Sequence, residues 1–127
     1  MSHLNLRQQE VKSSLITVPK VWGREVWIAN EPEYCCKYLY LNKDAQSSLH
    51  LHNIKKETFY SLNGQVALHI DGRDYMLNPF SRPKTVLPGQ EHQFRGITDA
   101  IILEVSTHHN EEDVVRFTPS QPGIHEP

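Results

Sequence analysis

The sequence predicts an all-β protein folded as a single sandwich or jelly-roll barrel. Short apolar runs recur at a spacing of about 8–12 residues, and helical periodicity is nearly absent. Gly, Pro and Asn residues, which favour turns, separate these runs. This pattern is typical of sandwiches and jelly rolls. The length of 127 residues fits one domain.

The expected strands are short and end at turn residues. They cover 21–29, 35–41, 47–52, 57–62, 65–70, 73–77, 85–87, 91–94 and 100–106. Asn63-Gly64 predicts a hairpin between two of them, and Asp71-Gly72 predicts a second tight turn. Residues 110–115 could form one helical turn. The chain therefore reads as one strand-rich domain.

The domain is expected to span 15–117, between a polar N-terminal arm, 1–14, and a proline-rich C-terminal tail, 118–127. An exposed sheet edge needs cover, and residues 15–18 could supply an extra strand to a partner. We therefore predict a homodimer.

Composition excludes several classes of partner. The net charge is −2, without a long block of like charge, so nucleic acid and anionic membranes have no electrostatic support. No run resembles a signal peptide or the roughly 20 apolar residues of a membrane span. A bridge between the adjacent Cys35 and Cys36 would be strained. We therefore expect a reducing, cytoplasmic location.

A candidate metal site stands out among the eight histidines. His50 and His52 are two residues apart, which places both imidazoles on one face of a strand. Glu57 follows after a short loop, and His92 follows a Pro-Gly turn. Three imidazoles and one carboxylate suit a single divalent transition metal ion: Mn, Zn, Fe, Co or Ni. Such a site usually leaves a position open for water or substrate.

The His-x-His pair alone would fit a solvated strand face equally well, so the glutamate and the distal histidine carry the prediction. The remaining histidines are not expected to bind the metal. They lie near the termini, in a polar loop or on an alternating strand: His3, His69, His108, His109 and His125.

These residues resemble the two motifs of the cupin family. His50-x-His52, Glu57 and Gly64 match the first motif, and the Pro-Gly-Gln-Glu-His segment ending at His92 looks like the second. The resemblance covers residues 22–116 and implies a cupin jelly-roll barrel. It also supports the homodimer.

The sequence departs from the cupin motifs at three positions. Asp44 stands where the first motif usually opens with Gly, whereas Val86 and Gly96 replace the usual Pro and Asn of the second. The four ligand positions are intact, so the departures concern loop shape.

Local features narrow the resemblance. Residues 21–25, 92–96, 102–106 and 111–117 are similar to the cupin domain of type II mannose-6-phosphate isomerase. The D-lyxose isomerase pattern of ligands and lysines is also present. It is matched by His50, His52, Lys55 and Glu57, with a second lysine at Lys37. The resemblance implies a metal-dependent aldose–ketose isomerase acting on a sugar or sugar phosphate.

Three residues are candidates for proton transfer. Isomerisation develops negative charge on a sugar oxygen, which a divalent metal stabilises, and a proton route also needs an acid and a base. A desolvated lysine near a cation can serve as base, so Lys37 and Lys55 are candidates. Lys37 shares an apolar face with Leu39 and Leu41. Glu104 lies in an otherwise apolar strand and is the third candidate, although an outward-facing position fits it as well.

Tyr60, Arg95 and Arg116 are candidates for binding sugar hydroxyls or a phosphate, for which the arginine fork is suited. Solvated surface positions are the alternative for each. Two other functions stay open: a non-haem iron dioxygenase with the same ligands, and a non-catalytic sugar-binding module. Nucleotide-sugar epimerases share the barrel but lack this metal set, and they rank lower.

Overall fold

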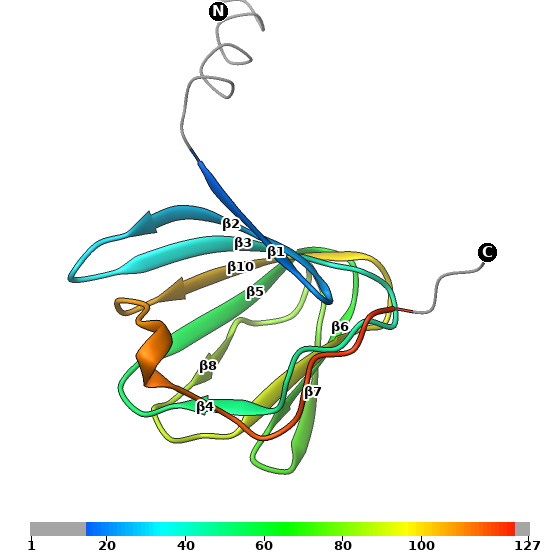
Figure 1. Ribbon diagram of the computed structural model, residues 1–127. Coiled ribbons are helices and arrows are strands. Elements are labelled where there is room, and N and C mark those ends of the chain that lie inside the picture. The colour runs from blue at the N-terminus through cyan, green and yellow to red at the C-terminus, as the bar shows by residue number, and fades with distance from the viewer. Residues whose placement is uncertain (1–14, 124–127) are drawn as a thin grey trace, which may run out of the picture.

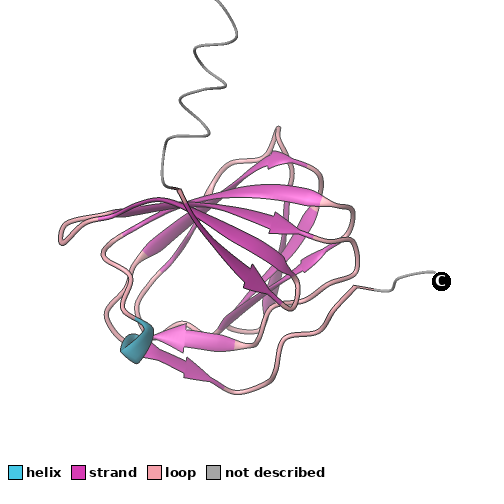
Figure 2. Cartoon of the chain, turned by 45° about the horizontal axis from the view of Figure 1, so that its top comes forward, coloured by secondary structure: helices cyan, strands magenta, loops and turns pink. Residues whose placement is uncertain are grey.

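Two antiparallel sheets face each other and enclose the interior of a jelly-roll barrel (Figures 1 and 2). The computed structural model describes residues 15–123, so the arm 1–14 lies outside the described residues. The six-stranded sheet has the order β1 (Ile16–Lys20), β2 (Gly23–Asn30), β3 (Cys35–Leu41), β10 (Ala100–Ser106), β5 (Glu57–Asn63) and β8 (Lys84–Val86). The five-stranded sheet has the order β11 (Val114–Arg116), β4 (His50–His52), β9 (His92–Gly96), β6 (Val66–Ile70) and β7 (Arg73–Leu77). The all-β prediction is confirmed.

The strand expected over 21–29 is β2, and a separate strand, β1, precedes it. Residues 16–20 form β1, which pairs with β2 of the same chain, with Ile16 opposite Trp27. β1 therefore covers the outer edge of β2, and β1 is itself the edge strand on that side of the six-stranded sheet (Figure 1). The homodimer and the cytoplasmic location stay predictions. Within residues 15–123 no helix is long or apolar enough to cross a membrane.

The two Gly-containing turns have different outcomes. Asp71 and Gly72 both have positive φ, 46° and 82°, and join β6 to β7 in the expected hairpin. The turn at Gly64 also has positive φ, but it carries the chain from one sheet to the other, so β5 and β6 do not pair. A Cβ at Gly64 would lie 2.1 Å from the carbonyl oxygen of Asp99, which explains the glycine. The predicted hairpin there is wrong.

Other local features differ in detail. The strand expected over 47–52 is reduced to the three residues of β4. The expected helical turn is a short 3-10 helix, η1 (Glu111–Asp113). Asp44, which replaces a motif glycine, has a φ of 65°. This is the region that glycine favours and that aspartate tolerates better than most residues. The altered motif therefore keeps the backbone conformation of a glycine turn.

Strand alternation divides the barrel interior into an apolar end and a polar end. In β3, Leu39 and Leu41 point inward, and their partners across β10 are Ile102 and Ala100. One step along the same faces, Lys37 of β3 lies opposite Glu104 of β10. The apolar end is a continuous core that includes Trp22, Phe59, Val66, Leu68, Leu77 and Phe94. The core therefore supports a set of buried polar side chains at the other end.

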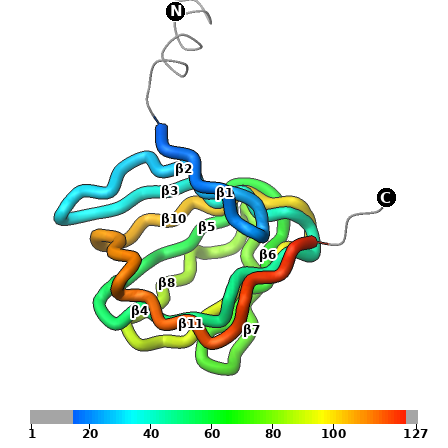
Figure 3. The backbone as a smooth tube through the Cα atoms, viewed as in Figure 1, coloured from blue at the N-terminus to red at the C-terminus, as the bar shows by residue number. Residues whose placement is uncertain are grey.

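The tube trace shows the C-terminal segment running along the five-stranded sheet (Figure 3). The backbone NH of Phe117 donates to the carbonyl of Leu49, and Gln121 forms a bridge with Gln46. Residues 118–121 are thus attached to the barrel beyond the expected domain end at 117. The earlier part of this segment, η1 and β11, lies beside the polar end of the interior.

Candidate functional site

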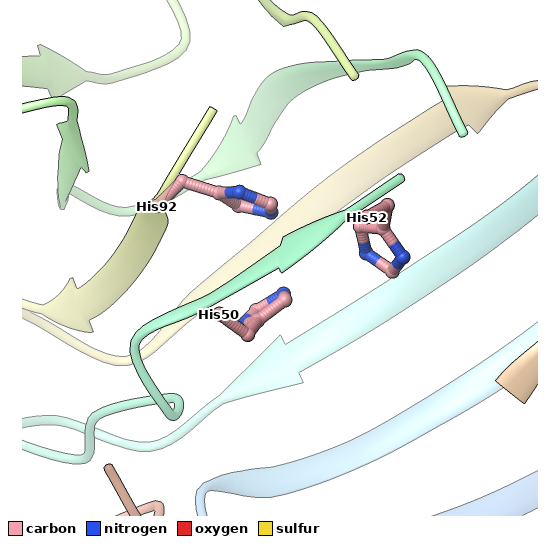
Figure 4. Close-up of side chains that lie close together, drawn as sticks. All are labelled: His50, His52 and His92. Carbon is pink, nitrogen blue, oxygen red and sulfur yellow. The ribbon is translucent and has the colours of Figure 1, made fainter. Parts of the chain in front are cut away.

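Three imidazoles converge from two neighbouring strands at the polar end of the barrel. His50 and His52 come from β4, and His92 comes from β9, where it pairs with His50. One nitrogen of each ring lies within 4.8 Å of those of the other two, an arrangement that could hold a metal ion. Figure 4 shows the three rings gathered beside β4. The period of two along a strand thus delivers the convergence that the sequence predicts.

Backbone hydrogen bonds fix two of the rings. The Nδ1 atom of His50 lies 2.8 Å from the carbonyl oxygen of Ser48, and that of His92 lies 3.0 Å from the carbonyl of Gln90. A carbonyl only accepts, so each Nδ1 carries a proton, and in the neutral ring Nε2 keeps the lone pair that a metal ion needs. Burial, followed by the neighbouring His92, lowers the pKa of His50 to about 3. Both rings are oriented by the backbone. His50 is neutral, whereas at His92 burial is outweighed by the Glu57 carboxylate, which raises the pKa of His92, so a metal ion would bind His92 in competition with a proton.

Glu57 completes the cluster from the start of β5. Its Oε2 atom lies 3.0 Å from Nε2 of His92 and 3.3 Å from Nε2 of His52. The Oε2 atom of Glu57 and Nε2 of His92 are buried and lack a hydrogen-bond partner. Unpaired buried polar atoms are rare and costly, and a cation between them would satisfy both. The residues present therefore fit a divalent metal ion.

A buried ion pair lies directly beside this cluster. The Nζ atom of Lys55 is 2.6 Å from Oε2 of Glu104 and 3.6 Å from Oε1 of Glu57. Burial would lower the pKa of Lys55, but the carboxylates of Glu104 and Glu57 outweigh it and raise that pKa. Lys55 therefore stays charged. The expectation of a lysine base with a lowered pKa is wrong for Lys55, since its carboxylate partners hold the proton.

Lys37 has its own partner. Its Nζ atom lies 3.4 Å from Oε1 of Glu25 and 4.3 Å from the centre of the Trp27 ring. Only 1% of the Lys37 side chain is exposed, so the expected inward position is found. Glu25 was not predicted as a site residue. It follows the Trp22–Gly23 entry, and its inward position depends on the register of β2 against β3.

His109 was not expected at the site, yet it contacts the buried ion pair. Its Nδ1 lies 3.0 Å from Nζ of Lys55, and its Nε2 lies 3.0 Å from Oε2 of Glu111. Burial, and then the charges of Lys55 and Lys37, lower the pKa of His109. No short sequence pattern indicates this residue, because the loop after β10 reaches the site only through the fold.

One interior pocket contains these groups. Its lining includes two of the three imidazoles, His50 and His52, together with Lys37, Lys55, Glu57, Glu104, His109, Lys20, Glu111 and Arg116. Arg116, a predicted substrate-binding residue, is half-exposed and is paired with Glu111. Cations and carboxylates therefore alternate along the pocket.

The other two predicted substrate-binding residues face away from the pocket. Tyr60 donates from its hydroxyl to the carbonyl of Pro79, 2.8 Å away. Arg95 lines a separate groove on the outer face of the five-stranded sheet. Each lies between two buried residues of its strand, so its own side chain points outward. Tyr60 and Arg95 are therefore not part of the interior pocket.

Asp113 organises the loop that joins His52 to Glu57. Its Oδ1 atom accepts hydrogen bonds from the backbone NH groups of Asn53 and Ile54, and its Oδ2 accepts from that of Lys55. Each donor lies 3.0 Å from its acceptor. The carboxylate thus holds the loop that carries Lys55 between the two candidate ligands.

We expect Asp113→Ala to lower the free energy of unfolding by about 1–3 kcal/mol, because it strips an acceptor from several backbone NH groups. It should also weaken metal binding. Denaturant unfolding and metal titration measure the two effects. Glu112→Ala, an exposed neighbour in η1, is the control. Equal behaviour of the two variants would contradict the role of Asp113.

Comparison with known proteins identifies the fold. No family model and no curated protein matches the chain. Among solved structures, an RmlC-like cupin from Shewanella frigidimarina matches with a TM-score of 0.70 and 16% identity, over 80% of this chain and 90% of that one. KdgF from Halomonas sp. matches with a TM-score of 0.65 and 13% identity, over 70% of this chain and 81% of that one.

Two further structures cover slightly more of the chain. The nucleoside dehydratase Pac13 has a TM-score of 0.68 and 15% identity, over 82% of this chain and 85% of that one. CapF from Staphylococcus aureus, a capsular polysaccharide assembling protein, has a TM-score of 0.73 and 14% identity; the match covers 82% of this chain but only 34% of CapF.

Proposed function

We propose that this chain is a metal-dependent aldose–ketose isomerase acting on a sugar or sugar phosphate. The proposal is based on the side chains inside the barrel, whose fold is the cupin barrel of these structures. The observation that carries the proposal is the buried Lys55–Glu104 pair beside the imidazole cluster, inside one pocket. Isomerisation needs charge stabilisation and proton transfer at adjacent atoms, and the pocket offers groups for both. The proposed metal ligands are His50, His52, Glu57 and His92.

The side chains in the pocket have different proposed roles in isomerisation. A bound divalent ion would act as a Lewis acid toward the negative charge that develops on the sugar oxygens. Glu104, ionised beside Lys55, is the candidate base for the proton on the carbon next to the carbonyl. The ammonium of Lys55 is the candidate acid and hydrogen-bond donor. Lys37, held by Glu25, would orient hydroxyl groups farther along the pocket.

The comparisons support a sugar-like substrate. CapF is named for capsular polysaccharide assembly and Pac13 for nucleoside dehydration, and both kinds of molecule contain sugars. The rim favours polar ligands as well, because Lys20, Arg116 and Glu111 line it. Arg116 could bind hydroxyl groups or, after release from Glu111, a phosphate.

A non-haem iron dioxygenase is the second candidate, because three neutral imidazoles and a carboxylate also hold Fe(II). The buried pairs of Lys55 and Lys37 with carboxylates have no evident role in that chemistry. A sugar-binding module without turnover is the third candidate. The isomerase is preferred because proton transfer during isomerisation assigns a role to the Lys55–Glu104 ion pair beside the imidazole cluster.

The test is turnover by defined metal forms. Metal-free protein is loaded with Mn, Zn, Fe, Co or Ni and incubated with a panel of aldoses and their 6-phosphates. NMR should detect a ketose, and in deuterated water the proton route should place deuterium next to the carbonyl. Metal-free protein and Glu104→Gln are the controls.

The outcomes separate the three candidates. Absence of a ketose from every sugar and metal would contradict the isomerase. Substrate-dependent oxygen uptake by the iron form would indicate the dioxygenase. A sugar that raises the melting temperature without being converted would indicate the binding module.

A further inference from the structure

The hydrogen bonds around Lys55 determine the state of His109. An ammonium group carries three donors and no acceptor, so Nδ1 of His109, 3.0 Å from Nζ of Lys55, must be the acceptor of that bond. The ring proton then lies on Nε2, which faces the carboxylate of Glu111 at 3.0 Å. A single neutral tautomer satisfies both contacts. His109 therefore links a buried cation to a carboxylate at the pocket rim.

The backbone of His109 is fixed independently of its ring. The side-chain carbonyl of Asn30 accepts from the NH of His109 at 2.9 Å, and the side-chain amide of Asn30 donates to the carbonyl of His109 at 3.1 Å. The ring edge also packs against Trp27, with 5.4 Å between the ring centres. Residues 79 positions apart thus form a two-bond clamp. Asn30 therefore fixes the backbone position of His109.

The imidazole of His109 holds the ammonium of Lys55 in position from the side, through the contact with Nδ1. Lys55 forms its short ion pair with Glu104, at 2.6 Å, whereas Glu57, at 3.6 Å, is beyond hydrogen-bond distance. Without His109, the ammonium could swing between the two carboxylates. Contact with Glu57 would place a cation against a candidate metal ligand.

We propose that His109 is a positioning residue that holds the ammonium of Lys55 against Glu104 and away from Glu57, with Glu111 fixing its tautomer. Its effect on turnover rests on the proposed isomerase function, whereas its tautomer does not. His109 itself is not assigned contact with substrate.

The first test measures the tautomer without any turnover. Long-range proton–nitrogen correlation spectra of the metal-free full-length protein, with nitrogen-15 in the histidine rings, report which ring nitrogen is protonated. We expect a neutral ring with a protonated Nε2, and His109→Phe should remove that signal. His108→Phe is the control, because the ring of His108 bonds the carbonyl of Glu31 instead. A protonated Nδ1 or a charged ring at neutral pH would overturn the proposal.

The second test uses kinetics of the metal-loaded protein. His109→Phe should lower kcat about tenfold or more, in line with the loss of a hydrogen bond to a charged group, while KM and metal stoichiometry stay within about twofold. His109→Gln should restore most of kcat, because its amide offers both an acceptor and a donor. Unchanged kcat in His109→Phe would overturn the proposal. If the unaltered protein converts no sugar, the proposed function fails, and the tautomer measurement still decides the role of His109.

Discussion

Glu104→Gln is expected to destabilise the protein and to remove isomerase turnover. The substitution keeps the shape of the side chain but takes the charge from the partner of Lys55, 2.6 Å away. Both side chains are almost fully buried, so the ammonium loses its nearest counter-charge and keeps only the more distant carboxylate of Glu57. Loss of one partner of a buried pair typically lowers the free energy of unfolding by about 3–5 kcal/mol. The amide oxygen still accepts a hydrogen bond, which places the expected loss near the lower end.

The measurement is denaturant unfolding of the metal-free protein, which separates this effect from metal binding. A second variant makes the result specific: Lys55→Met combined with Glu104→Leu removes both charges together. Replacing a buried pair by apolar residues is often neutral, so stability should recover while turnover stays absent. If the double variant is no more stable than Glu104→Gln, the loss comes from packing and the ion-pair explanation is wrong.

The candidate ligands could be predicted because their spacing encodes geometry. Two histidines separated by one residue face the same side of any strand, and that holds for His50 and His52 without knowledge of the fold. His92 is different, since its approach to His50 depends on β4 pairing with β9. Only the resemblance to a family motif indicated that pairing. The same distinction explains the hairpins: Asp71-Gly72 joins neighbouring strands, whereas the turn at Gly64 leads to the opposite sheet.

Three supporting residues could not be predicted because their contacts are set by tertiary structure. Glu25, His109 and Asp113 reach the site from strand β2, the loop after β10 and the helix η1. Asp113 bonds backbone groups 58–60 positions away along the chain. Polar residues with such partners look like ordinary surface residues in the sequence. Their role appears only when the register of every strand is known.

Alternation could have excluded two of the predicted substrate contacts. Tyr60 follows Phe59, and Arg95 follows Phe94. The phenylalanines are buried, so their neighbours point outward. The side-chain chemistry of Tyr60 and Arg95 suited a sugar, but side-chain direction in a strand is decided by period-two packing. Arg116, the final residue of β11, is the member of the set that lines the pocket.

Loss of His92 is expected to remove most of the affinity for a divalent metal ion. His92 is 1% exposed, its Nδ1 is held by the carbonyl of Gln90, and its Nε2 has no hydrogen-bond partner beside Glu57. That nitrogen is therefore available to a metal. Because loss of a residue that merely supports a ligand costs about 10–100-fold in affinity, His92→Ala should exceed that range. Competition with a coloured chelator and elemental analysis measure affinity and stoichiometry.

The stability of the folded protein gives an independent measure of metal binding. A ligand that binds only the folded protein, at about 100 times its Kd, adds about 2.7 kcal/mol to the free energy of unfolding. Metal should therefore raise the melting temperature of the unaltered protein and of His69→Ala, a control in β6 whose ring faces Asp74. Metal should leave the melting temperature of His92→Ala unchanged. His92→Gln, whose larger side chain fills more of the core, should also show no change in melting temperature with metal. If both His92 variants bind and respond to metal as the unaltered protein does, the cluster is not a metal centre, and the isomerase proposed from it fails with it.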